Sequence, residues 1–301
     1  MDMSMASECR GYTRFEKAKL KVANIVKIVA IAHPRAVVIF TLTALIVAAI
    51  AERSLPPLQT TVALLLAMAA IQTSVGIFND YYDRDLDAVA KPYRALPAGL
   101  VSAQSAYRAA WIAVALGLGA AATLGLSSML VLALGAAMGF LYSARLKRSV
   151  LSWLPYAIAY PMVPLWVWVS LGKFRPEMFL IYPTAIPFSL GVHLCNQLRD
   201  YEDDTEQGMK GLTQHLGKET SSWICVSLLL LSPILPLGAG YVHGSSTLMF
   251  AVAVVVHWVL ILHCLYRQWA EGGAQIWAVL FKRVQWGGPL LLIGWAFSIS
   301  G

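Results

Sequence analysis

The sequence predicts an all-α protein, a polytopic bundle of helices that spans a membrane. Of its 301 residues, 58% are hydrophobic and only 13% are charged, and the mean hydropathy is +0.64. A soluble domain carries about 25% charged residues, so this composition indicates a chain dissolved in lipid. The apolar residues also gather into runs of about 20, the length that crosses roughly 30 Å of hydrocarbon.

Nine such runs follow one another, and we expect each to be a transmembrane helix. Within hydrocarbon a spanning segment must satisfy its own backbone hydrogen bonds, and these runs lack the alternation of barrel strands. Their approximate bounds are 34–52, 57–78, 106–124, 127–143, 150–171, 177–196, 221–242, 246–267 and 285–300. The chain is therefore predicted to divide into an N-terminal cytoplasmic segment, residues 1–33, and a nine-helix membrane domain, residues 34–301.

Positive charge orients the predicted bundle. Of the 23 Lys and Arg residues, all except Arg53, Lys173 and Arg175 fall on the side that holds the N-terminus. Because Lys and Arg accumulate in cytoplasmic loops, we expect the N-terminus inside and the C-terminus outside. A prokaryotic inner (plasma) membrane is the expected location, with an organellar membrane as the alternative.

The net charge of +7 reflects contact with anionic lipid headgroups and requires no nucleic acid. Within the N-terminal segment, residues 12–31 mix apolar and basic side chains. This pattern predicts an amphipathic helix on the cytoplasmic surface, with a plain basic tail as the alternative.

Two short acidic stretches lie on the predicted cytoplasmic side, after the second and the sixth apolar runs. On a helix that extends from the membrane, Asp80, Asp83 and Asp87 share one face. Asp200 and Asp204 are spaced to share a face in the same way. Crowded carboxylates repel one another unless a cation neutralises them, and hard oxygen ligands favour Mg²⁺ or Ca²⁺. Mg²⁺ completes its shell with water and phosphate, so these five aspartates are candidate metal ligands and catalytic residues that clamp a diphosphate.

Basic and amide side chains lie close to both stretches, as a diphosphate site requires. Arginine binds phosphate oxygens in pairs, lysine adds a point charge, and an asparagine oxygen can bind a metal or orient a carboxylate. The candidates for substrate contact are Asn79, Arg84, Arg94, Arg145, Lys147, Asn196 and Arg199. Loop solvation would explain a single acidic stretch, but two stretches with interleaved arginines favour a binding site.

Three segments carry a family resemblance: NDYYDRDLD at 79–87, KPYRALPAG at 91–99 and NQLRDYEDD at 196–204. Together with the nine-run plan, they resemble the two signatures of the UbiA superfamily of intramembrane prenyltransferases. The first motif is more similar to the chlorophyll synthase, homogentisate and geranylgeranylglyceryl phosphate branches. Ala95 and Asp203 depart from the proline and glycine common in the family, yet neither change removes a predicted ligand.

The resemblance implies a bundle around a lipid-open cavity, with aspartates at the cytoplasmic mouth that bind Mg²⁺ and a polyprenyl diphosphate donor. It also implies that Tyr142, Arg145 and Lys147, where the fourth run ends, contact the diphosphate. The implied reaction is magnesium-dependent transfer of the prenyl group, within membrane lipid, to a lipophilic acceptor that is an aromatic compound, a quinone precursor or an alcohol.

Two alternatives to prenyl transfer remain open from the sequence. In a terpene cyclase of the same fold, the prenyl cation is captured by its own chain. In a non-enzymatic membrane carrier, the acidic stretches would form a cation vestibule.

Overall fold

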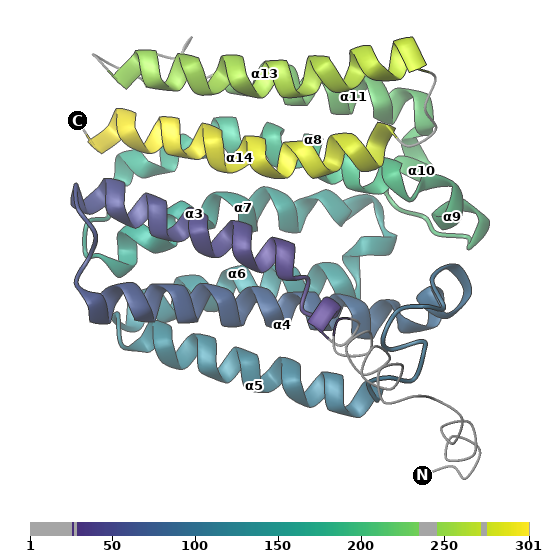
Figure 1. Cartoon of the computed structure of the whole chain (residues 1–301), viewed down its shortest axis with the longest axis horizontal. Helices are drawn as coiled ribbons and strands as arrows, with labels where there is room; N and C mark the ends of the chain where they lie inside the picture. Colours follow the sequence, from purple (N-terminus) through teal and green to yellow (C-terminus); the bar gives the residue numbers. More distant parts are fainter. Residues whose placement is uncertain (1–25, 27–28, 235–245, 272–275, 301) are drawn as a thin grey trace, which may run out of the picture.

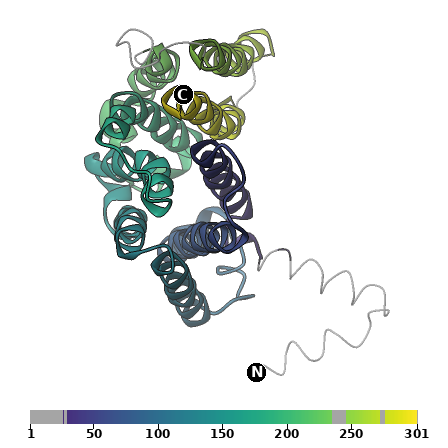
Figure 2. The same ribbon diagram turned by 90° about the vertical axis from the view of Figure 1, so that its left-hand side faces the viewer.

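The computed structural model describes residues 26, 29–234, 246–271 and 276–300, which form helices joined by turns, with no strand. The long helices run side by side in one bundle (Figures 1 and 2). Within this described part, seven helical segments are long and apolar enough to cross a membrane. They are Pro34–Glu52, Leu58–Ala90, Ala103–Ala122, Leu126–Ala144, Val150–Ser170, Pro176–Arg199 and Phe250–Arg267. The predicted all-α membrane class is confirmed, whereas the count of nine spans stays a prediction.

The helices follow the apolar runs closely. The long ones are α3 (Pro34–Glu52), α4 (Leu58–Ala90), α5 (Ala103–Ala122), α6 (Leu126–Ala144), α7 (Leu154–Ser170), α8 (Tyr182–Arg199), α11 (Lys218–Leu231), α13 (Ser246–Glu271) and α14 (Ile276–Ser300). The short elements between them are η1 (Leu146–Arg148), η2 (Val150–Trp153), η3 (Pro176–Ile181), α9 (Tyr201–Glu206), α10 (Leu212–Leu216) and η4 (Ser232–Ile234).

Two helices extend beyond the apolar runs predicted for them. An apolar run ends where charged residues begin, whereas a helix can continue through them. α4 continues to Ala90, past the apolar run that ends near residue 78, as expected for a helix that carries Asp80, Asp83 and Asp87 beyond the membrane, and α14 begins at Ile276 instead of near residue 285. The second difference places Lys282 and Arg283 inside a helix, where the sequence suggested a loop. The predicted run 221–242 is described only to residue 234, and the amphipathic segment 12–31 lies almost wholly outside the described residues.

Helices α3, α4, α6, α7, α8 and α14 close a ring, because each packs against the next and α14 returns to α3. Helix α5 packs outside this ring on α4 and α6, α11 packs on α8, and α13 packs on α14 (Figure 2). The ring surrounds a cavity, described below, that draws its wall from all of its helices. The predicted opening of this cavity to lipid stays a prediction.

Glycines allow several of these helices to approach closely, as small residues do in membrane bundles. Gly139 of α6 faces Val75 of α4, and Gly287 of α14 faces His257 of α13. The His257 ring is fully buried, and its Nε2 lies 3.0 Å from the carbonyl oxygen of Leu229. A Cβ atom on Gly287 would lie 2.3 Å from Nδ1 of this ring. The contact between α13 and α14 therefore requires glycine at position 287.

We expect Gly287→Ala to lower the free energy of unfolding by about 1–3 kcal/mol, because the added methyl group must displace a buried and hydrogen-bonded ring. The matched control is Gly119→Ala on α5, where a Cβ atom meets open space. This control should leave stability unchanged or raise it by up to about 1 kcal/mol, as alanine favours helix. Thermal unfolding in detergent measures both variants, and equal melting temperatures would contradict the packing argument.

Candidate functional site

A cavity of about 430 Å³ lies inside the ring of helices and has two chemically different ends. Its charged wall residues come from the end where α4, α6 and α8 finish. These are Asp83, Asp87, Lys91, Arg94, Lys147, Arg199, Asp200, Asp203 and Asp204, and the His33 ring lies among them. Deeper in the bundle the wall is uncharged, with Phe40, Met68, Leu132, Val163 and Trp166 among its residues. One chamber thus joins a highly charged mouth to an apolar interior.

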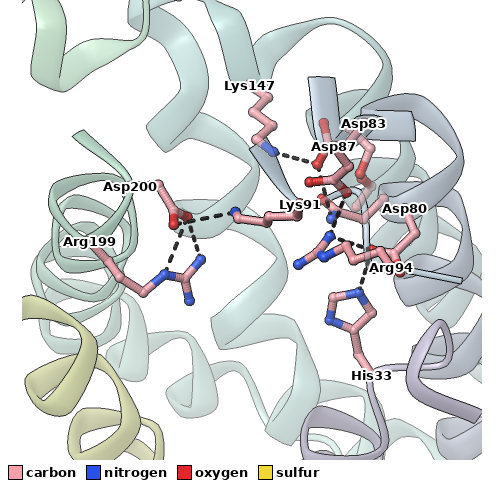
Figure 3. A network of polar contacts seen from close by, with 12 residues as sticks. His33, Asp80, Asp83, Asp87, Lys91, Arg94, Lys147, Arg199 and Asp200 are labelled. Atoms are coloured by element: carbon pink, nitrogen blue, oxygen red, sulfur yellow. Dashed lines mark hydrogen bonds and ion pairs between the residues drawn. The ribbon is translucent and has the colours of Figure 1, made fainter. Parts of the chain in front are cut away.

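The first acidic stretch lies on one face of α4, as its spacing predicted. Asp80, Asp83 and Asp87 are only 5–6% exposed. Nη1 of Arg94 donates to Asp80 at 3.1 Å and to Asp87 at 2.6 Å, while Nζ of Lys147 donates to Asp83 at 2.5 Å (Figure 3). These cationic partners make the burial of three carboxylates on one helix face tolerable.

His33 and Asn79 complete the hydrogen bonding of this stretch. Nε2 of His33 lies 2.9 Å from Oδ1 of Asp80, and Nδ2 of Asn79 donates to Asp83 at 3.2 Å. His33 precedes α3 with a φ of 49°, in the left-handed region that few residues other than glycine adopt. His33 was not predicted as a site residue, because nothing in a lone histidine beside Pro34 indicates a partner 47 positions away.

The second acidic stretch begins where α8 ends, since Arg199 is its last residue. Asp200 accepts a 2.5 Å hydrogen bond from Arg199 and lies 3.5 Å from Nζ of Lys91, which follows α4 (Figure 3). Burial alone would raise the pKa of Asp200, but the hydrogen bond and charge of Arg199, together with Lys91, hold that pKa below its ordinary value. Lys91 therefore links the two stretches across the mouth of the cavity.

Asp204 differs from the other four aspartates. Its backbone N–H donates to the Asp200 carbonyl at 2.9 Å in the first turn of α9, which keeps the two residues one turn apart. Among the described residues, no basic side chain lies within ion-pair distance of its carboxyl group. Burial raises the pKa of Asp204 to about 6. A cation bound at this carboxyl group would favour its ionised form.

The predicted substrate residues divide into two groups. Asn79, Arg94, Tyr142, Lys147, Asn196 and Arg199 line the cavity. Arg84 and Arg145 are not among the described residues of its wall. Arg84 follows Asp83 directly, and neighbouring residues on a helix point about 100° apart, so the two side chains do not share a face. The guanidinium of Arg84 donates instead to the Tyr81 carbonyl at 2.9 Å. Arg145 is exposed where the chain leaves α6.

Gln197 lines the cavity but carried no recognisable signal in the sequence. Gln197 lies on α8 beside the predicted Asn196, and its amide accepts from the backbone N–H of Thr213 and donates to Ser152, both at 3.3 Å. Ser152 in turn lies 2.9 Å from Nε2 of His193. This buried network ties α10 and η2 to α8, and so positions the segment that carries the second acidic stretch.

Magnesium fits the donor chemistry of the mouth. The described residues include no group of three His, Cys, Asp or Glu side chains placed to hold one ion. Mg²⁺ usually needs only one or two protein carboxylates, because water and substrate phosphate supply its other ligands. Aspartate and asparagine oxygens, the donors found here, are the hard ligands that suit it.

Comparison with known proteins matches the model of the UbiA prenyltransferase family to residues 37–286. Chlorophyll synthase of Arabidopsis thaliana is 30% identical over 189 residues, which cover 59% of this chain and 48% of that protein. Digeranylgeranylglyceryl phosphate synthase of Methanothrix thermoacetophila is 30% identical over 196 residues, which cover 62% and 72%. The chain spans about half the length of the chlorophyll synthases that it matches.

The fold is also shared with solved structures. A UbiA homolog from Archaeoglobus fulgidus, bound to GPP and Mg²⁺, superposes with a TM-score of 0.67 at 19% identity, covering 88% of this chain and 99% of that one. The apo structure of a UbiA homolog from Aeropyrum pernix K1 gives a TM-score of 0.67 at 17% identity, covering 85% and 96%.

We expect Arg94→Gln to destabilise the metal-free protein by about 1–3 kcal/mol, because it leaves the buried Asp80 and Asp87 without their shared counter-ion. Added Mg²⁺ should restore part of the loss by binding the released carboxylates. The control is Arg84→Gln, which removes an arginine paired with the exposed Asp85 and should cost at most about 1 kcal/mol. Melting temperatures in EDTA and in Mg²⁺ test this, and equal shifts in both variants would refute it.

Proposed function

The chain belongs to the UbiA prenyltransferase family, and from this premise we propose that it transfers a prenyl group from a polyprenyl diphosphate to a lipophilic acceptor within the membrane, in a magnesium-dependent reaction. The observation that carries the proposal is the cavity with a charged mouth and an apolar interior. A prenyl diphosphate has the same division, since its head is strongly anionic and its tail is hydrocarbon. The anionic head matches the charged mouth of the cavity, and the hydrocarbon tail matches its apolar interior.

Asp80, Asp83 and Asp87 of the first stretch and Asp200 and Asp204 of the second are the proposed magnesium ligands. Magnesium held there would neutralise the charge that develops on the departing diphosphate. The side chains of Lys147 and Arg94 neutralise carboxylates in this structure. In the proposed complex they turn to the diphosphate oxygens, where charge-assisted hydrogen bonds favour the leaving group.

In the proposed reaction, the bond between the allylic carbon and the diphosphate oxygen breaks, a bond from that carbon to the acceptor forms, and the acceptor loses a proton. The allylic carbon carries positive charge on the way, and water would capture it. Phe40, Tyr160 and Tyr156 form an aromatic row on the wall. The ring centroid of Tyr160 lies 5.7 Å from that of Phe40 and 5.3 Å from that of Tyr156. Their faces can stabilise a cation by about 0.5–2 kcal/mol each, and they exclude water.

The proposed acceptor is an aromatic compound, a quinone precursor or an alcohol, in keeping with the chlorophyll and digeranylgeranylglyceryl phosphate synthases among the relatives. The proposed orientation places the aspartates and the N-terminus in the cytoplasm and the C-terminus outside, in a prokaryotic inner membrane. Terpene cyclisation and passive transport, the alternatives raised by the sequence, are not favoured by relatives named as synthases.

The test is prenyl transfer in nanodiscs with geranyl, farnesyl and geranylgeranyl diphosphates, a panel of acceptors, and either Mg²⁺ or EDTA. Prenylated product should require Mg²⁺, and Asp83→Asn and Asp204→Asn should each lower kcat/KM by about 10²-fold or more. The matched control is Asp85→Asn, because that carboxylate lies on the same helix but is 85% exposed. It should retain activity within about twofold, since exposed pairs contribute little.

Three results would overturn the proposal. A hydrocarbon product formed without acceptor would indicate a cyclase. Donors that neither bind nor react would favour a carrier. An equal loss of activity in Asp85→Asn and Asp83→Asn would show that the buried aspartates have no special role.

A further inference from the structure

Trp166 of α7 lies at the end of the cavity farthest from the aspartates. The α4 wall of the cavity runs from Asp87 back to Met68, and at the rise of a helix Met68 is ~22 Å along the axis from Asp83. Trp166 and Met68 both line the cavity and are each only 1% exposed. A chain that enters from the charged mouth therefore meets them last.

A buried hydrogen-bond chain holds the indole of Trp166 in place. Its Nε1 donates to Oγ of Ser128 on α6 at 3.0 Å, and Ser128 lies 2.7 Å from Oγ of Ser170. Ser170 donates to the Trp166 carbonyl at 2.7 Å. In hydrocarbon a polar group without a partner is costly, so the ring cannot swing away without breaking this chain. Met68, by contrast, has a flexible side chain that adapts to its neighbours.

We infer that Trp166 is the floor of the prenyl site and limits the length of the donor chain. The inference rests on the proposed function and names the residue that decides which donors fit. A chain that ends before the indole gains the full benefit of apolar contact. A longer chain must either displace a ring held from two helices or bend away from it, and in both cases its last carbons gain no further contact with the far wall.

The test measures binding and transfer for a series of prenyl diphosphates from geranyl to hexaprenyl. Binding is followed by native mass spectrometry with non-reactive thiodiphosphate analogues, so that it does not depend on catalysis. Trp166→Leu should raise the ratio of long-donor to short-donor affinity by about 10-fold or more, as expected for a pocket that gains space. Its matched control is Trp168→Leu, on the same helix and 3% exposed but not among the described residues of the wall. It should leave the ratio unchanged.

Ser128→Ala provides a second variant that keeps the volume of the tryptophan and removes only its hydrogen-bond partner. It should shift the ratio in the same direction by a smaller factor, and it decides the question if Trp166→Leu does not fold. An unchanged ratio in a folded Trp166→Leu or, failing that, in Ser128→Ala would overturn the inference, as would equal shifts at positions 166 and 168. Length-dependent binding without transfer would refute the proposed function and leave the length limit standing.

Discussion

The structure depends on burying negative charge at the edge of a membrane. Asp80, Asp83 and Asp87 occupy one face of α4 and are nearly inaccessible. Carboxylates so placed are strongly destabilising unless cations reach them. Arg94 and Lys147 supply the cations, and each is brought there by a separate turn of the chain. The electrostatic requirement of one helix face thus determines where the loop after α4 and the turn after α6 must lie.

The alternation of the helices makes this convergence possible. α4, α6 and α8 all finish at one end of the ring, and α3 begins there, so His33, Lys147 and Arg199 line the same cavity although they are far apart in sequence (Figure 3). Ion pairs of this kind can exchange partners when a new anion and a metal arrive, because each cation keeps its charge while its neighbours change. Ion pairs within the protein therefore stabilise the charged mouth, and they can still rearrange when a ligand binds.

Features that belong to a single segment could be predicted from the sequence, whereas contacts between distant segments could not. Apolar runs located the helices, since hydropathy and length are properties of a single segment, and the spacing of the aspartates predicted their shared face. The early start of α14 was missed because Lys282 and Arg283 interrupt its apolar run. Proximity in sequence also misled: Arg84 lies beside Asp83 yet points away from the cavity, whereas His33 reaches Asp80 from another helix.

The two ends of the cavity are built by opposite physical means. At the mouth, charged pairs with partly exposed cations can rearrange around the proposed diphosphate. At the far end, Trp166 is buried, and its indole is held by the hydroxyl group of Ser128, which is itself hydrogen-bonded to Ser170. Binding of the proposed diphosphate head can therefore tolerate rearrangement, because charges attract one another over a distance. Binding of the proposed prenyl tail depends on shape, because a hydrocarbon has no charged or polar group to recognise. Shape discriminates between tails only where the cavity wall is rigid.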